Sequence, residues 1–400
     1  MSKRLVVLAD DFSGAAEIGG IAYRYGLRAE IQLSLDVNSS ADVIVLDTDT
    51  RVLSESDAIR KISDIGVSMK PLRPSAHLFK KVDSVMRGHV VSEINALVKT
   101  FAFKRVFMLP ANPSRGRIIQ FGKYFVNDKP LDETIFSMDP DFPATSADIA
   151  IKMMHPSPDL THLHVSPGDT CPNGMLITGN IQSKDDLKKY VSTTNENDLC
   201  CGAAELFEAF LENLGYRPQI TTTTQPPSLD TAYTLIVNGT TVKNTNDITL
   251  YGQSDITVLP LPGNFERAQF IFPDKDALVW HKMVVDALTS RKVAVVSIDH
   301  PIQHTKTMSE MFLKQFVMLI QYITGYMNMT EIHFCLTGGA TASAIIRHLE
   351  HGKLLVKNEI TPGVVTLAMI DNKAETYFTV KPGSYAWPAS IVQNLHSGKK

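Results

Sequence analysis

Residues 5–15 read LVVLADDFSGA and join a short apolar run to two acidic residues and a glycine. A run of five apolar residues with turn chemistry after it is typical of a buried parallel strand. The residues from about Ala15 to Tyr25 are helix-like and end at Gly26, which suits a helix C-cap. This stretch therefore predicts a strand that leads directly into a helix, the first part of a strand–helix–strand unit.

The same alternation continues along the first half of the chain. Further strands are predicted at 42–46, 77–82, 105–108 and 176–178, with helices from Ser54 or Ser56 towards Met69, at 90–101 and after Ser183. Strands that alternate with helices form parallel sheets, because each helix returns the chain to the end of the sheet at which the previous strand began. The sequence predicts an α/β fold whose largely parallel sheet carries helices on both faces.

A break in this pattern divides the chain. Residues 217–228 hold four consecutive threonines and three prolines, a composition typical of a linker. Strand patterns then restart at 233–237, 292–298 and 331–336, with a long amphipathic helix at about 307–326. We therefore predict two α/β domains, 1–228 and 229–400.

Composition excludes several classes of protein. The chain has 400 residues, of which 44% are hydrophobic and 20% charged, so it is neither disordered nor collagen-like. The net charge of −3 gives no general reason to bind nucleic acid or an anionic membrane. The four cysteines form no CxxC pair, and no apolar run reaches 18 residues. We expect a soluble cytoplasmic protein with reduced, mostly buried thiols.

Two adjacent carboxylates, Asp10 and Asp11, stand where the first strand ends and the first helix begins. Ligands of open α/β sheets bind beyond the carboxyl ends of strands. Ser13 and Gly14 permit close backbone approach at the helix N-terminus, which favours an anionic ligand. Adjacent like charges need a cation, a hydroxyl donor or a proton nearby. The structural alternative is that one aspartate caps the helix and the other is solvated.

Two basic segments follow later strands of the same predicted sheet. The first contains Lys81, Asp83, Ser84, Arg87 and Gly88, and the second, PANPSRGR at 110–117, ends at Arg117. Arginine can grip a carboxylate with two parallel hydrogen bonds. At one sheet edge these groups would suit a small polyhydroxylated acid, the cations holding its carboxylate and an aspartate accepting a hydroxyl proton. The alternative is a solvated loop with an internal Asp83–Arg87 pair.

The second half of the chain has four glycine turns after predicted strands, at 238–241, 337–342, 361–364 and 381–384. Backbone N–H groups at such turns can hold phosphates, although a single one is more often only a turn. Four in one domain favour a nucleotide site. The standard phosphate and dinucleotide motifs, GxxxxGK[ST] and GxGxxG, are absent.

These segments together resemble the four-carbon acid sugar kinase family. Residues 9–15 are similar to its ADDxTGA opening, 81–88 to its KxDSTLRG segment and 110–117 to its PxxPxxGR segment. Residues 124–140 follow its course, and 238–240, 337–341, 362–364 and 381–383 are similar to its later glycine motifs. The chain departs from the family at Ala340, where an acidic residue is usual, and at Thr240, Val365 and 384–386.

The resemblance implies an ATP-dependent kinase that phosphorylates a terminal hydroxyl of threonate, erythronate or 3-oxo-tetronate. It implies a sugar-acid-binding domain at 1–228, a nucleotide-binding domain at 229–400 and an active site in the cleft between them. We expect Asp10 and Asp11 to orient or deprotonate the hydroxyl, one of them through Mg²⁺, although the metal ligands stay open. Substrate-binding residues would be Ser13, Gly14, Lys81, Asp83, Ser84, Arg87, Gly88 and Arg117. Nucleotide-binding residues would be Gly239, Thr240, Gly338, Gly339, Ala340, Thr341, Gly363, Lys381 and Gly383.

Other readings stay open at this point. A catalytically silent sugar-acid sensor would keep the first domain and lose nucleotide chemistry, as the departures in the second half allow. A sugar-acid dehydrogenase would need the dinucleotide fingerprint that the sequence lacks. The partners are then a sugar acid and ATP, with a homodimer possible and neither nucleic acid nor a membrane involved.

Overall fold

The computed structural model describes residues 3–139, 141–153, 160–220, 229, 231–240, 256–262, 275–298, 306–349, 352–371, 374–383, 385–388 and 390–391. The chain divides into two compact units, Met1–Ile220 and Thr221–Lys400. Of the predicted linker, Gln219 and Ile220 still belong to unit 1, where their backbone N–H groups donate to Arg24 O. Residues 221–228 of that linker lie outside the described residues.

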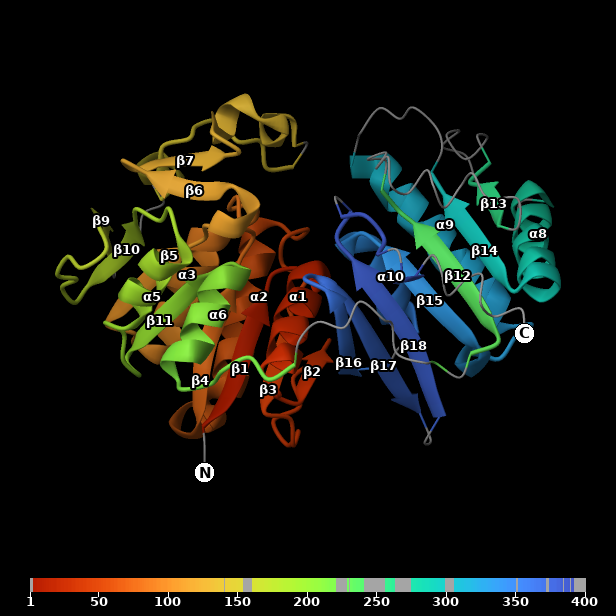
Figure 1. The fold of residues 1–400 in the computed structure, drawn as a ribbon, viewed down its shortest axis with the longest axis horizontal. Helices are drawn as coiled ribbons and strands as arrows, with labels where there is room; N and C mark the ends of the chain where they lie inside the picture. Colours follow the sequence, from red (N-terminus) through yellow and green to blue (C-terminus); the bar gives the residue numbers. More distant parts are fainter. Residues whose placement is uncertain are drawn as a thin grey trace. The chain divides into compact units, whose positions relative to one another are not determined.

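Unit 1 contains a parallel sheet with the strand order β2-β3-β1-β4-β11-β5-β10-β9 (Figure 1). The strands are β1 (Arg4–Ala9), β2 (Ala29–Gln32), β3 (Val43–Asp47), β4 (Ala76–Lys81), β5 (Arg105–Leu109), β9 (Thr161–Val165), β10 (Met175–Gly179) and β11 (Asp198–Gly202). The parallel α/β fold predicted from the sequence is confirmed. The sequence missed β2, because its buried positions include the polar residues Glu30 and Gln32 and so no apolar run is present.

Helices cover both faces of this sheet. The longer ones are α1 (Phe12–Arg24), α2 (Glu55–Met69), α3 (Val90–Phe101), α5 (Lys184–Val191) and α6 (Ala204–Asn213). Helices α2 and α3 pack against each other, while α6 packs against both α1 and α5 (Figure 1). Ser54 caps α2, and Ser183 and Asp186 form a capping box at α5, as the sequence indicates. A separate antiparallel sheet of β6 (Arg117–Gln120), β7 (Lys123–Val126) and β8 (Lys129–Pro130) follows β5.

A buried ion pair joins β4 to α3 in the core of unit 1. Lys80 Nζ lies 2.7 Å from Glu93 Oε2, and both side chains are almost fully buried. Removing one partner of such a pair leaves an uncompensated buried charge. We expect Glu93→Gln to lower the free energy of unfolding by about 3–5 kcal/mol in urea titrations. Glu196→Gln, which breaks the exposed Lys3–Glu196 pair, is the matched control and should leave the midpoint unchanged; equal midpoints for the two variants would contradict the prediction.

Unit 2 contains a mixed sheet with the order β13-β14-β12-β15-β18-β17-β16. The strands are β12 (Tyr233–Asn238), β13 (Thr257–Pro260), β14 (Val293–Ser297), β15 (Ile332–Thr337), β16 (Lys353–Thr361), β17 (Val364–Asp371) and β18 (Ala374–Lys381). From β13 to β18 neighbouring strands are parallel, whereas β16, β17 and β18 pair antiparallel. The glycine turn at 361–364 is therefore the turn of the β16–β17 hairpin. Helices α8 (Lys275–Arg291), α9 (Lys306–Thr324) and α10 (Gly339–His348) complete the unit.

Candidate functional site

The connections of the unit 1 sheet diverge at the carboxyl ends of β1 and β4. These strands are neighbours in the sheet. The chain leaves β1 into α1, which packs with α6, and leaves β4 towards α3, which packs with α2. Adjacent strands whose connections depart to opposite faces define the point where ligands bind in open α/β sheets. Asp10 and Asp11 follow β1, and residues 82–89 follow β4.

Asp11 is the N-cap of α1 and also faces the cations of this edge. Its Oδ1 accepts a hydrogen bond of 2.9 Å from Gly14 N, and its Oδ2 accepts one of 2.5 Å from Ser13 Oγ. Gly14 allows this approach, since a Cβ there would lie 2.7 Å from Asp11 Oδ1 and 3.0 Å from Lys81 Nζ. Asp11 thus combines the capping role with a place in the polar cluster.

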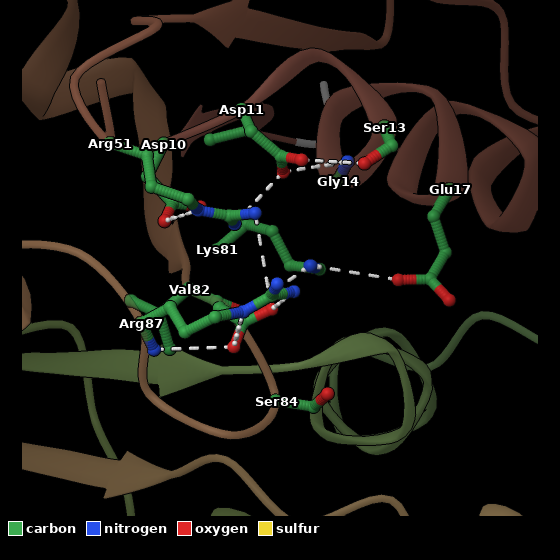
Figure 2. A network of polar contacts seen from close by, with 12 residues as sticks. Asp10, Asp11, Ser13, Gly14, Glu17, Arg51, Lys81, Val82, Ser84 and Arg87 are labelled. Carbon is green, nitrogen blue, oxygen red and sulfur yellow. Dashed lines mark hydrogen bonds and ion pairs between the residues drawn. The ribbon is translucent and has the colours of Figure 1, made fainter. Parts of the chain in front are cut away.

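Arg51 joins both aspartates, and sequence reasoning missed it. Its Nε and Nη2 donate to the two carboxylate oxygens of Asp10, each at 2.9 Å, and Nη2 lies 3.0 Å from Asp11 Oδ1 (Figure 2). Asp10 is 3% exposed, so neither aspartate is the solvated one that the structural alternative required. Arg51 follows β3, a neighbour of β1, and its position after a strand end was the available signal.

Lys81 and Glu17 extend the cluster along α1. Lys81 is the last residue of β4, and its Nζ lies 3.5 Å from Glu17 Oε2 and donates to Val82 O at 3.2 Å (Figure 2). The ammonium group also lies close to the N-terminus of α1, since a Cβ on Gly14 would be 3.0 Å from Lys81 Nζ. Lys81 therefore sits between Asp11 and Glu17 with its charge compensated.

Asp83 and Arg87 form an internal pair, as the alternative interpretation of this loop proposed, but its carboxylate is buried whereas the Arg87 side chain is partly exposed. Arg87 Nε and Nη2 donate to Asp83 at 3.1 and 2.9 Å, and Arg87 Nη1 reaches Asp139 Oδ2 at 3.3 Å. Asp83 is 8% exposed and also accepts the backbone N–H of Val85 at 3.1 Å. The pair belongs to the cluster, because Arg51 Nη1 lies 3.9 Å from Asp83 Oδ1.

Arg117 is the cation of this edge that has no carboxylate within ion-pair distance among the described residues. It donates to the hydroxyl of Ser84, and its guanidinium lies over the ring of Phe136, 5.6 Å from the centroid. The same ring faces Arg87 at 5.7 Å. Ser84 is fixed in turn, since its carbonyl accepts the Tyr124 hydroxyl at 2.6 Å. Gly88 lies against Arg51, where a Cβ would be 3.4 Å from Arg51 Cγ.

The electrostatics of the cluster keep the Asp11 and Asp83 carboxylates ionised. Burial raises the pKa of Asp11, but Arg51, Lys81 and the Ser13 hydroxyl outweigh it, so the pKa lies below its usual range. The pKa of Asp83 is likewise lowered, because Arg87 and Arg51 more than offset the effect of burial. Both groups therefore accept hydrogen bonds at neutral pH and do not donate them.

Unit 2 contains a cavity of about 260 Å³. Seven of the nine predicted nucleotide-binding residues line it: Gly239, Thr240, Gly338, Gly339, Ala340, Thr341 and Gly383. They come from the ends of β12, β15 and β18 and from the first turn of α10, whose N-cap is Gly338. Apolar residues of α9, including Phe312 and Phe316, form another part of the lining. A helix N-terminus beside glycine turns suits phosphate groups.

Gly363 and Lys381 are not among the residues that line this cavity. Gly363 lies in the β16–β17 turn, where its N–H donates to Glu359 Oε1 at 2.9 Å and its Cα faces the ring of Tyr385. Lys381 is buried, donates to Tyr385 O and lies over the ring of Trp387. Both residues pack around the segment that follows β18.

The described carboxylates do not fit a magnesium site of the protein's own. No group of three or more His, Cys, Asp or Glu side chains in the described ranges is placed to hold a metal ion. The oxygens of Asp10 and Asp11 already accept hydrogen bonds from Arg51, Ser13 and Gly14. The expectation that one of these aspartates acts through Mg²⁺ is therefore not supported by their geometry. Mg²⁺ commonly reaches such sites on substrate phosphates.

Two further features concern the cysteines and the possibility of a membrane-spanning helix. Cys200, Cys201 and Cys335 are buried free thiols, and Cys171 is a partly exposed one, as expected. Among the helices that the structure describes, none is both long and apolar enough to cross a bilayer.

Comparison with known proteins concerns unit 1 most directly. Residues 5–167 match the family model of the sugar-binding N-terminal domain. The chain is 34% identical over 152 residues to a D-threonate kinase of Salmonella typhimurium, which covers 37% of this chain and 35% of the relative. It is 29% identical over 147 residues to a D-erythronate kinase of Heliobacterium modesticaldum, covering 35% and 33%. The chain thus spans about a third of the length of these curated relatives.

Solved structures extend the likeness to the whole fold. A Haemophilus influenzae protein from a family of unknown function has a TM-score of 0.68 at 17% identity, covering 98% of this chain and 99% of that one. A Salmonella typhimurium protein has a TM-score of 0.75 at 16% identity, covering 98% of both chains. These two structures show the fold alone, whereas residues 5–167 are similar in sequence to the sugar-binding N-terminal domain and to kinases of four-carbon sugar acids.

Proposed function

We propose that this protein transfers the γ-phosphoryl group of ATP to a terminal hydroxyl of a four-carbon sugar acid. Unit 1 would bind the sugar acid and unit 2 the nucleotide. The observation that carries the proposal is the charge-compensated cluster of Asp10, Asp11, Arg51, Asp83 and Arg87 at the carboxyl edge of the unit 1 sheet. The threonate and erythronate kinase names of its relatives support the substrate class.

Charge pairing in the cluster suggests how a sugar acid would be oriented. Arg51, Lys81 and Arg87 are each matched by carboxylates of the protein, whereas Arg117 faces only a hydroxyl and an aromatic ring. The substrate carboxylate would therefore bind at Arg117, since a charged partner strengthens a hydrogen bond roughly twofold. The hydroxyl end would then point towards Asp11, an ionised acceptor.

Asp11 would serve mainly to orient the acceptor hydroxyl. In the transfer step the hydroxyl oxygen forms a bond to the γ-phosphorus, and the bond to the β–γ bridging oxygen breaks with its electron pair to ADP. The hydroxyl proton passes to the Asp11 carboxylate as the new bond forms. A carboxylate of low pKa suffices for this, because the transition state of phosphoryl transfer is loose and the hydroxyl becomes acidic only as the bond forms.

The cavity of unit 2 supplies the features that a nucleotide needs. Gly338 and Gly339 at the start of α10 would hold phosphate oxygens through backbone N–H groups. Phe312 and Phe316 of α9 offer an apolar wall for the base. Mg²⁺ bound to the nucleotide phosphates would neutralise their charge. The hydroxyls of Thr240 and Thr341 add donors near the same turns.

An ADP-release assay with D-threonate, L-threonate, D-erythronate and 3-oxo-tetronate tests this function. We expect ADP release above the no-acceptor rate with at least one of these acids and none with the uncharged polyol erythritol. ADP release that no acid stimulates would overturn the proposed function.

A silent sugar-acid-binding protein is the second candidate, and Ala340 favours it. Ala340 lines the cavity with a side chain that can neither coordinate nor hydrogen-bond a nucleotide. Thermal-shift assays separate the two candidates. A kinase gains stability from both MgATP and a sugar acid, whereas a silent binder responds to the acid alone.

A further inference from the structure

Arg51 occupies the centre of the unit 1 cluster although no motif pointed to it. Among the described residues it contacts three carboxylates, those of Asp10, Asp11 and Asp83, from the loop after β3. Its backbone N–H also donates to Asp10 O at 3.2 Å, so main chain and side chain both tie it to the end of β1.

The three nitrogens of the Arg51 guanidinium have different hydrogen-bond partners. Nε and Nη2 hold Asp10 in a two-bond clasp, and Nη2 is shared with Asp11 at 3.0 Å. Nη1 donates to no described residue within hydrogen-bond distance, and its nearest carboxylate oxygen, on Asp83, is 3.9 Å away. The planar fork therefore fixes the spacing of the aspartates, which a lysine could not do.

Asp10 and Asp11 differ in side-chain exposure and in how many of their carboxylate oxygens bind Arg51. The Asp10 side chain is 4% exposed and uses both oxygens on Arg51, whereas the Asp11 side chain is 17% exposed. Asp11 is thus the one of the two that a ligand can reach. Asp10 acts as the counter-ion that anchors Arg51.

We infer that Arg51 is a positioning residue for phosphoryl transfer: anchored by Asp10, it aims the Asp11 carboxylate at the acceptor hydroxyl. The inference rests on the proposed function for its kinetic consequences, but the ionisation of Asp11 can be measured without turnover. The inference also gives the two aspartates different roles: Asp11 contacts the substrate, and Asp10 holds Arg51 in place.

The groups that face Asp11 decide how its ionisation should respond. From α1 come the Gly14 N–H, the Ser13 hydroxyl and the more distant Glu17, from β4 comes Lys81, from the loop after β4 comes Asp83, and Asp10 precedes it in the chain. Arg51 is the largest of the charges that lower its pKa. Without Arg51, burial and the neighbouring carboxylates raise the Asp11 pKa, since both disfavour the charged form.

Two Arg51 variants separate charge from geometry. In Arg51→Gln the acid limb of the kcat/KM–pH profile should move to higher pH by about 1–3 units, because the opposing charge is lost. In Arg51→Lys the charge remains and the limb stays near its wild-type pH, but kcat falls by about tenfold to a hundredfold through misalignment. ¹³C NMR titration of the Asp11 carboxyl, assigned with Asp11→Asn, should show the same pattern without any substrate.

The matched control is Arg105→Gln, which removes a comparable two-bond clasp on Asp198 at the opposite end of the sheet. It should change neither the profile nor the Asp11 titration. An unshifted Asp11 titration in Arg51→Gln would overturn the inference, as would an equal shift in Arg105→Gln. If the wild-type protein phosphorylates no sugar acid, the proposed function fails, while the NMR titration still decides whether Arg51 controls Asp11.

Discussion

Asp11→Asn is expected to lower kcat by about 10²–10⁴-fold, the contribution typical of a positioned proton acceptor. Asparagine caps helices as well as aspartate does, so the bond from Gly14 N to the side chain survives and α1 keeps its start. What disappears is the negative charge that would receive the hydroxyl proton. Steady-state kinetics with saturating sugar acid and ATP, together with a thermal melt, measure both effects.

Asp148→Asn is the matched control, because Asp148 caps α4 (Ile149–Lys152) through Ala150 N at 2.8 Å and stands outside the cluster. Its kcat should equal that of the wild type. Near-normal kcat in Asp11→Asn would remove Asp11 from the reaction. Lost activity accompanied by a collapsed melting temperature would show a structural defect, and Asp11→Ser, which also caps, would then carry the test.

Gly239→Ala should weaken nucleotide binding by about 10²-fold while sugar-acid binding stays unchanged. A Cβ at this position would lie 1.8 Å from Thr341 Oγ1 and 2.8 Å from Thr341 Cβ, so the first turn of α10 must shift. Both residues line the unit 2 cavity. Isothermal titration with a non-hydrolysable ATP analogue, and separately with the sugar acid, measures the two affinities.

Gly325→Ala provides the comparison within the same unit, since its added methyl would lie 3.3 Å from Tyr322 O and 3.7 Å from Gln321 O, and Gly325 is not part of the cavity lining. Nucleotide affinity should survive in that variant. If Gly239→Ala bound the analogue as tightly as the wild type, the cavity would not be the nucleotide site. If Gly239→Ala weakened binding of the sugar acid as much as binding of the nucleotide, the assignment of one ligand to each unit would be wrong.

The sequence predicts the fold well where the buried positions are apolar and recur with the spacing of a strand or a helix. Residues 5–9 and 90–101 have uniform apolar or helical patterns, and they form β1 and α3. The pattern fails where buried positions are polar. In β2, Gln32 Nε2 donates a hydrogen bond of 3.2 Å to Glu30 Oε2, so these buried polar side chains satisfy each other. The strand therefore lacks the apolar pattern by which it could be predicted. The sequence at 361–364 indicates a glycine turn after a strand, but a turn alone does not distinguish the β16–β17 hairpin from the start of a crossover.

The candidate site could be predicted only as far as each residue stood beside a strand end with recognisable chemistry. Asp10, Lys81 and Arg87 met that condition. Arg51 also follows a strand, but TDTR at 48–51 resembles an ordinary polar loop. Its three-carboxylate contact depends on β1, β3 and β4 being neighbours in the sheet, an order that local sequence does not contain. Lys381 is a basic residue at a strand end that the structure buries beside Trp387, a surrounding that its local sequence does not reveal.

Transfer of a labelled phosphoryl group tests the central claim most directly. Erythronate or threonate would be incubated with ATP carrying ¹⁸O in the γ-phosphoryl group, and the products separated and weighed by mass spectrometry. The account predicts a sugar-acid phosphomonoester, esterified at the terminal hydroxyl, that retains the ¹⁸O label. Recovery of the label only as inorganic phosphate or intact ATP, with the acid unmodified, would contradict it.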